Sequence, residues 1–402
     1  MIQRDSYLEE IKPFIGKNII KVLVGVRRAG KSTLLEMLAQ HFVDSGTDPS
    51  TLLHLRFESE EYAHINNKDD LVRYVYESLD TSKPFILLLD EIQEVEGWEV
   101  ALRSFMVDCT ADIYITGSNA HVLSSDLATY ITGRYVTIPI YPLSFAEFYD
   151  GLQAVTGQVD SRSAFRKYVL QGGFPFQNEL AFEQSASLKY LSDLLSTILL
   201  KDVVRRNSIR DVDLLERLVR YAAAEEGHLL SVKNIADYLK SERRKAAQET
   251  IANYLYAAEN AYLFYRIPRE DALGKSILAF NEKWYLVDPG LRQALGLDNA
   301  SHIDQVLEGI VCMELKRRGY ELTVGKIGHQ EIDFIAKKGS SIEYYQVSYL
   351  VVDEATRNRE FGALEALPDN YPKYVLSLDE FQTSRNGIEG KNLIDWLLAG
   401  AD

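Results

Sequence analysis

The stretch that decides the fold is GVRRAGKS, from Gly25 to Ser32. It matches the phosphate-binding pattern G-x-x-x-x-G-K-[ST]. The apolar run at residues 19–24 predicts a strand before this loop, and the apolar spacing of residues 32–43 predicts a helix after it. Such a loop can turn its backbone N–H groups around a phosphate, and the helix presents the positive end of its dipole. The sequence therefore predicts a nucleotide-binding protein.

The residues of this loop have distinct predicted tasks. Lys31 would place its ammonium against the β- and γ-phosphates of ATP, and Ser32 would place its hydroxyl on Mg²⁺. Gly25 and Gly30 would let the backbone close around the phosphates without steric conflict. The predicted nucleotide-binding residues are Gly25, Val26, Arg27, Arg28, Ala29, Gly30, Lys31, Ser32 and Thr33.

A second part of the same site follows the apolar run at residues 84–89, which ends in Asp90 and Glu91. Continuous apolar strands are typical of parallel sheets that are buried on both faces. A carboxylate at the end of such a strand can hold the water shell of Mg²⁺, which is the role predicted for Asp90. Glu91 is then placed to polarise the attacking water. A strand at residues 52–57 and a helix near residues 71–79 separate this element from the phosphate loop.

Three more residues are candidates for catalysis. The predicted strand at residues 112–119 has a polar end, Ser118 and Asn119, which would lie beside the γ-phosphate as sensors or would cap a following helix. Arg134 precedes a predicted strand and is a candidate arginine finger, acting in cis or from a neighbouring subunit. The alternative for Arg134 is a surface arginine paired with an acid. The predicted catalytic residues are Glu91, Lys31, Arg134, Asn119 and Ser118.

The composition excludes several classes of protein. The 402 residues, of which 46% are hydrophobic, predict about two to four domains. With 44 basic against 59 acidic residues, the net charge of −15 argues against broad electrostatic coating of nucleic acid. Cys109 and Cys312 have no metal-site spacing and fit a reducing cytoplasm, where we expect the protein. No run of roughly 18 apolar residues predicts a membrane span.

The order of the elements predicts an α/β protein with four parts. Residues 1–150 alternate strands and helices, which indicates a P-loop core with a parallel sheet covered by helices on both faces. Residues 151–206 have helical apolar spacing and are predicted to form a lid. Residues 207–290 are predicted to form a winged helix, and residues 291–402 an α/β domain of the restriction-endonuclease type.

The winged-helix prediction rests on three helical segments followed by a hairpin. The helices are expected at residues 212–225, 231–239 and 248–261, and the hairpin strands at 262–267 and 277–280. Winged helices bind duplex DNA or proteins, so this domain would contact either DNA or a protein partner. The third alternative is that its basic turn is only a solvated loop. The basic residues that would contact DNA phosphates are Lys240, Arg243, Arg244 and Lys245.

A second candidate metal site lies in the last hundred residues. Glu308 on a predicted helix, Asp333 at the start of a predicted hairpin and Gln346 on its return strand occupy the ligand positions of a metal-dependent nuclease. Ser348 stands where such a nuclease needs a lysine to orient the attacking water. We therefore expect a nuclease-like fold that does not cleave.

Six blocks of the chain, taken together, resemble one family. It comprises the bacterial and archaeal AAA-type ATPases with a winged-helix middle and a C-terminal domain of unknown function that has a restriction-endonuclease-like fold. The blocks are Gly25–Ser32, Asp90-Glu91, Ile115–Ser118, Gly133–Tyr135 with Pro142–Phe145, Gly172–Pro175, and Glu331–Phe334 with Tyr345–Ser348. The resemblance covers nearly the whole chain. It implies ATP binding with Mg²⁺ and identifies no substrate.

Three functions remain open on the sequence alone. The first is an Mg²⁺-dependent ATPase that acts as a conformational switch on DNA or on a protein partner. The second is an ATP-gated, metal-dependent nuclease, which the absent lysine disfavours. The third is a protein-interaction module that holds ATP without hydrolysing it. A finger acting in trans through Arg134 would in addition require a homo-oligomer.

Overall fold

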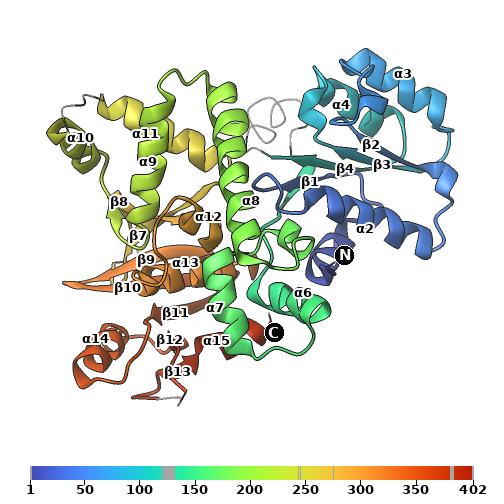
Figure 1. The fold of residues 1–402 in the computed structure, drawn as a ribbon. Helices are drawn as coiled ribbons and strands as arrows, with labels where there is room; N and C mark the ends of the chain where they lie inside the picture. The colour runs from blue at the N-terminus through green and yellow to red at the C-terminus, as the bar shows by residue number, and fades with distance from the viewer. Residues whose placement is uncertain are drawn as a thin grey trace. The chain divides into compact units, whose positions relative to one another are not determined.

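The computed structural model describes residues 2–118, 120, 131, 133–242, 244, 246–274, 276–380 and 384–400. The predicted sensor Asn119 lies outside these residues, as do Arg243 and Lys245 of the predicted basic cluster. The chain forms two compact units (Figure 1). The first comprises Met1–Tyr141 with Asn260–Tyr262, and the second comprises Pro142–Glu259 with Leu263–Asp402. The first unit thus ends before residue 150, and the division into four parts stays a prediction.

In its described residues, the first unit contains a five-stranded parallel sheet with the order β2-β3-β4-β1-β5. The strands are β1 (Ile20–Val24), β2 (Leu52–Arg56), β3 (Phe85–Asp90), β4 (Ala111–Gly117) and β5 (Tyr135–Pro139). Helix α2 covers one face, and α3 and α4 cover the other (Figure 1). The helices are α1 (Asp5–Ile11), α2 (Lys31–Asp44), α3 (Lys68–Ser78) and α4 (Trp98–Asp108). The predicted α/β class is confirmed.

Burial on both faces explains the apolar strands of this sheet. All five residues of β1 are buried, and so are Phe85 and residues 87–90 of β3. A parallel sheet with helices on each side leaves no solvated face, so the strands carry continuous apolar runs. The apolar core of the sheet and of α3 and α4 includes Leu71, Leu102 and Phe105.

The strand order brings the predicted site residues to one edge of the sheet. Strand β4 lies between β1 and β3, with Val24 opposite Gly117 and Leu89 opposite Ile115. Parallel strands end at a common carboxyl edge, so the loop after Val24, the acids after Leu89 and the residues after Gly117 meet there. Ligands of open α/β sheets bind at this edge.

The second unit begins with helices where the lid was predicted. Their bounds are α6 (Phe145–Thr156), α7 (Ser161–Gln171) and α8 (Gln184–Thr197), which continues as the π-helical η7 (Ile198–Arg205). Helix α12 (Pro289–Ala294) packs against both α7 and α8. This part of the chain therefore belongs to the core of the second unit.

An eight-stranded mixed sheet forms the rest of the second unit, counting its described residues. Its order is β13-β12-β11-β10-β9-β7-β8-β6, and the parallel pair β7–β9 joins the hairpin β7–β8 to the C-terminal strands. The strands are β6 (Leu229–Leu230), β7 (Phe264–Asp271), β8 (Ser276–Leu286), β9 (Glu321–Ile327), β10 (Gln330–Lys338), β11 (Ser341–Val347), β12 (Lys373–Ser377) and β13 (Glu389–Asn392). The remaining helices are α9 (Val212–Ala224), α10 (Val232–Ser241), α11 (Gln248–Asn260), α13 (Ile303–Arg317), α14 (Glu354–Glu365) and α15 (Leu393–Leu398).

Two adjacent glycines after α7 lie close to two other segments of the second unit. A Cβ atom on Gly172 would lie 1.8 Å from Asp288 Oδ1, and one on Gly173 would lie 2.2 Å from the carbonyl oxygen of Leu143. Asp288 caps α12 and accepts a hydrogen bond of 2.6 Å from the N–H of Gly173. These close backbone approaches explain why glycine occupies both positions of the Gly172–Pro175 block.

Candidate nucleotide site

The phosphate-binding loop connects β1 to α2, as predicted. Its backbone takes positive φ angles at Gly25 (150°), Arg28 (66°) and Gly30 (100°). A Cβ atom on Gly25 would lie only 2.1 Å from the carbonyl oxygen of Ile140, so a side chain cannot be accommodated there. Among the described residues, no side chain caps the N-terminus of α2, whose first helical residue is Lys31. The first amides of α2 are thus available to an anion such as a phosphate.

The ammonium of Lys31 lies inside the loop. Its Nζ atom donates hydrogen bonds of 3.0 Å each to the carbonyl oxygens of Gly25 and Val26. The residue is 4% exposed. A buried positive charge held at the start of α2 fits the phosphate contact predicted for this lysine.

Asp90 is the last residue of β3, Glu91 follows it directly, and both are buried. Thr116 on β4 connects them, because its Oγ1 donates a 2.6 Å hydrogen bond to Asp90 Oδ1 and accepts one of 2.8 Å from the N–H of Glu91. Both acids are thereby fixed at the carboxyl edge of the sheet. Thr116 lies in the predicted strand and in the Ile115–Ser118 block of the family resemblance, but no role of its own was predicted for it.

Glu91 has a strained backbone and a restrained side chain. Its φ angle of 54° is unusual for a residue other than glycine, and such strain is often found at functional sites. Its Oε2 accepts a hydrogen bond of 3.4 Å from Ser118 Oγ and another from Gln93 Nε2. Ser118 thus lies next to the candidate base, as its predicted sensor role requires.

Arg4 supports the phosphate-binding loop through hydrogen bonds to backbone carbonyl oxygens, and it was not among the predicted site residues. Its Nη1 donates a 3.0 Å hydrogen bond to the carbonyl oxygen of Ala29, and its Nη2 donates one of 2.9 Å to that of Tyr141. Its guanidinium stacks over the ring of Tyr7 at 4.5 Å and is nearly inaccessible to solvent. Arg4 therefore joins the N-terminal segment to the phosphate-binding loop.

The other predicted residues of the loop point to different partners. Arg27 forms an ion pair of 3.1 Å with Glu58, and Arg28 is exposed. Ser32 and Thr33 lie in the first turn of α2 and are half-buried. Ser32 follows Lys31 directly at the mouth of the loop, where a hydroxyl ligand of Mg²⁺ is expected.

Arg134 does not lie at this edge of the sheet. It directly precedes β5, and the adjacent Tyr135 pairs with Ile20 at the start of β1. The phosphate-binding loop follows Val24 at the other end of β1, roughly 15 Å away at the usual rise per strand residue. An arginine finger acting in cis is therefore not supported by this arrangement, whereas one acting in trans stays a prediction.

The candidate second metal site contains a lysine. Lys283 Nζ on β8 lies 2.8 Å from Glu308 Oε1 and 3.7 Å from Asp333 Oδ1. Gln346 Oε1 accepts a hydrogen bond of 3.3 Å from the N–H of Asp333. Burial and the charge of Glu308 raise the pKa of Asp333 well above its usual range. Within the described ranges, no group of three or more His, Cys, Asp or Glu side chains is arranged to hold a metal ion.

The predicted basic cluster is partly neutralised. Arg244 Nη2 forms an ion pair of 2.8 Å with Asp211, and Arg244 Nη1 forms another with Asp213. Lys240 is exposed at the end of α10. Two acids thus bind the only arginine of this cluster that the structure describes, which weakens the case for phosphate contact at this turn.

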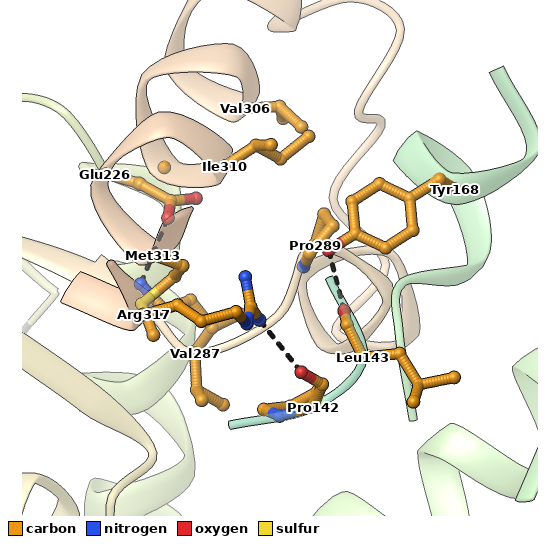
Figure 2. Close-up of a pocket in the computed structure, with 12 residues that line it drawn as sticks. Pro142, Leu143, Tyr168, Glu226, Val287, Pro289, Val306, Ile310, Met313 and Arg317 are labelled. Atoms are coloured by element: carbon orange, nitrogen blue, oxygen red, sulfur yellow. Dashed lines mark hydrogen bonds between the residues drawn. The ribbon is translucent and has the colours of Figure 1, made fainter. Parts of the chain in front are cut away.

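A pocket in the second unit is too small for a ligand (Figure 2). Its volume is about 10 Å³, which suffices for a single water molecule at most. Figure 2 shows Tyr168 donating to the carbonyl oxygen of Leu143 at 3.1 Å and Arg317 donating to that of Pro142 at 2.8 Å. Glu226 lies at the same cavity and accepts a hydrogen bond of 3.0 Å from the N–H of Leu286. These contacts are structural.

The sheet order and the loop define a P-loop ATPase fold, and comparison with known proteins agrees. The AAA domain family matches residues 17–149, and a family of domains of unknown function matches residues 162–301. An uncharacterised protein of Haemophilus influenzae is 38% identical over 99% of each chain. An uncharacterised protein of Methanocaldococcus jannaschii is 30% identical over 87% of this chain and 78% of its own.

The chain belongs to this family of AAA-type P-loop ATPases. Among solved structures, the Walker-type ATPase of Pyrococcus abyssi has a TM-score of 0.48 at 17% identity, covering 74% of this chain and 96% of that one. A search of the described helices finds none with the length and apolar character needed to cross a membrane.

Proposed function

We propose that this protein is an Mg²⁺-dependent ATPase that works as a conformational switch. The observation that carries the proposal is the meeting of Lys31, Asp90 and Glu91 at one edge of the sheet, with Thr116 bonded to both acids. Phosphoryl transfer needs positioning and charge stabilisation more than covalent chemistry, and these groups supply both.

The residues at the loop fit a nucleotide with its metal. Gly25 and Gly30 allow close backbone approach, Lys31 contributes the positive charge, and Ser32 with Asp90 would hold Mg²⁺. Mg²⁺ would neutralise the phosphate oxygens when bound. The buried carboxylate of Glu91 would accept a proton from the attacking water, oriented by its contacts with Ser118 and Gln93.

Steady-state ATP hydrolysis by three variants tests this proposal. Lys31→Ala removes the phosphate contact, so both ATP binding and turnover should be lost. Glu91→Gln keeps the shape of the side chain but removes the base, so turnover should fall roughly 10²-fold or more while ATP still binds. Glu94→Gln, an exposed acid in the same turn, is the matched control and should leave turnover unchanged.

Two results would contradict the proposal. Turnover by Glu91→Gln at the wild-type rate would remove Glu91 from catalysis. Tight ATP binding without phosphate release by the wild type would instead favour a module that merely holds ATP. Calorimetry with ATP and with a non-hydrolysable analogue separates binding from hydrolysis in each variant.

The second unit is the part of the chain that would bind the target of the switch. The order helix, strand, helix, helix and hairpin from α9 to β8, with β6 paired to β8, supports a winged helix. Because Arg244 is bound by Asp211 and Asp213, a protein partner is better supported than duplex DNA. ATP turnover measured with and without duplex DNA, across protein concentrations, tests both the DNA contact and a homo-oligomer that uses Arg134 in trans.

A further inference from the structure

Three carboxylates of the second unit converge on one ammonium group. Lys283 Nζ lies 2.8 Å from Glu308 Oε1, 2.7 Å from Glu331 Oε1 and 3.7 Å from Asp333 Oδ1. The lysine is 2% exposed. The three acids come from α13 and β10, whereas Lys283 comes from β8, so the cluster joins three elements.

Other donors of the chain also contact the three acids. Glu308 Oε1 also accepts a hydrogen bond from the hydroxyl of Tyr285, and Asp333 Oδ2 accepts one of 2.9 Å from the N–H of Val347. Arg269 lies 3.8 Å from Glu331 Oε2. Both the centre of the cluster and much of its periphery are thus occupied by donors of this chain.

Carboxylate oxygens are the ligands that a hard divalent cation prefers, but with Lys283 in place these three acids are not arranged to hold one. The lysine side chain fills the point on which they converge. Its ammonium is a compact charge and can pair with several oxygens at once. A divalent cation could enter only by displacing the ammonium of Lys283 from the centre. The displaced ammonium would then stay buried beside the metal ion, as a second positive charge.

We propose that Lys283 is the resident cation of this cluster, balancing Glu308, Glu331 and Asp333 and excluding divalent metal from it. Lys283 would then prevent metal binding, and the absence of a lysine after Gln346 would prevent activation of the attacking water. Both features predict that this domain does not cleave nucleic acid. The inference concerns only the second unit and does not depend on the proposed ATPase.

Charge on the neighbouring groups agrees with this assignment. Burial alone would lower the pKa of Lys283, but the surrounding Glu308, Asp333 and Glu331 raise it above its usual range. The ammonium therefore stays charged throughout the physiological pH range. Removing it would leave three acids around a centre that a divalent cation can fill.

Mn²⁺ titration of the full-length protein tests the proposal. All proteins carry Asp90→Asn, so that the nucleotide site lacks its predicted metal carboxylate. The parent should bind no Mn²⁺ at the cluster, whereas Lys283→Met should take up one equivalent that is lost again in Lys283→Met/Asp333→Asn. Lys337→Met is the matched control, because Lys337 lies in the same sheet but pairs at 2.6 Å with Glu270, outside the cluster.

Thermal melts give a second readout, because Mn²⁺ should raise the Tm of Lys283→Met and leave that of the parent unchanged. A folded Lys283→Met that takes up no Mn²⁺ would overturn the proposal. So would one equivalent of Mn²⁺ on the parent that disappears in Asp333→Asn. The parent titration can overturn the proposal on its own, whether or not Lys283→Met folds.

Discussion

At the scale of single residues, the candidate site depends on one threonine that orients two acids. Thr116→Val keeps the side-chain volume but removes the donor to Asp90 and the acceptor for the N–H of Glu91. Loss of such supporting contacts typically costs 10- to 100-fold in metal affinity or activity, so we expect a fall in kcat of about that size. Thr137→Val, on β5 of the same sheet, is the control. Wild-type kcat in Thr116→Val would show that the acids need no such support.

Arg4 allows a second prediction at this scale. Lysine in its place keeps the charge but cannot span the carbonyl oxygens of Ala29 and Tyr141 in one planar fork. We expect Arg4→Lys to weaken ATP binding several-fold, because the loop loses its support, while the exposed Arg73→Lys leaves binding unchanged. Titration calorimetry measures both, and equal ATP affinities would contradict this role.

Lys31, Asp90 and Glu91 could be predicted because each follows a recognisable strand at a fixed spacing. Thr116 and Arg4 could not. Arg4 bonds to a carbonyl 137 positions away, and Thr116 to an acid 26 positions away. No local pattern encodes such contacts, which exist only once the strand order is set. Arg134 shows the converse. Its place before a predicted strand made it a plausible arginine finger, but the strand register places it at the edge of the sheet opposite the phosphate-binding loop.

At the scale of elements, a close backbone approach joins the segment after α7 to the segment before α6. Gly173→Ala would place a methyl group 2.2 Å from the carbonyl oxygen of Leu143, so the backbone at one of these two residues must move. Overpacking of this kind costs about 1–3 kcal/mol or more, which should appear as a lower Tm in calorimetry. Gly362→Ala in α14 is the control, because its Cβ would make only an ordinary contact of 3.6 Å and should be neutral or stabilising. Equal melting temperatures would contradict the packing argument.

The positions of strands could be predicted from the sequence more accurately than the pairing between distant strands. Periodicity located β7 and β8 as a hairpin near its observed position. It did not indicate that β7 pairs with β9 and so continues the C-terminal sheet, because pairing between distant strands is decided by packing rather than by local pattern. The segment after residue 350 contains α14, β12, β13 and α15, for which the sequence analysis made no prediction.

At the scale of the whole molecule, two buried acids make stability depend on pH. Burial raises the pKa of Glu226 to about 8, although the charge of Arg292 opposes the shift, and burial raises the pKa of Asp288 to about 7. Both acids hold their protons more tightly in the folded chain than in the unfolded one. Their contribution to stability is therefore present below the unfolded pKa, near 4.5 for Glu226, and is lost as pH rises through the folded value.

Glu226→Gln tests this dependence, because an amide is uncharged at every pH and can still accept the hydrogen bond from Leu286. We expect the free energy of unfolding of the wild type to fall by about a few kcal/mol between pH 5.5 and pH 8.5, as the pKa shift of Glu226 implies. The free energy of unfolding of Glu226→Gln should fall less over the same range. Glu216→Gln, an exposed acid on α9, should follow the wild type. Urea denaturation at four pH values measures all three, and parallel curves for wild type and Glu226→Gln would place the titrating group elsewhere.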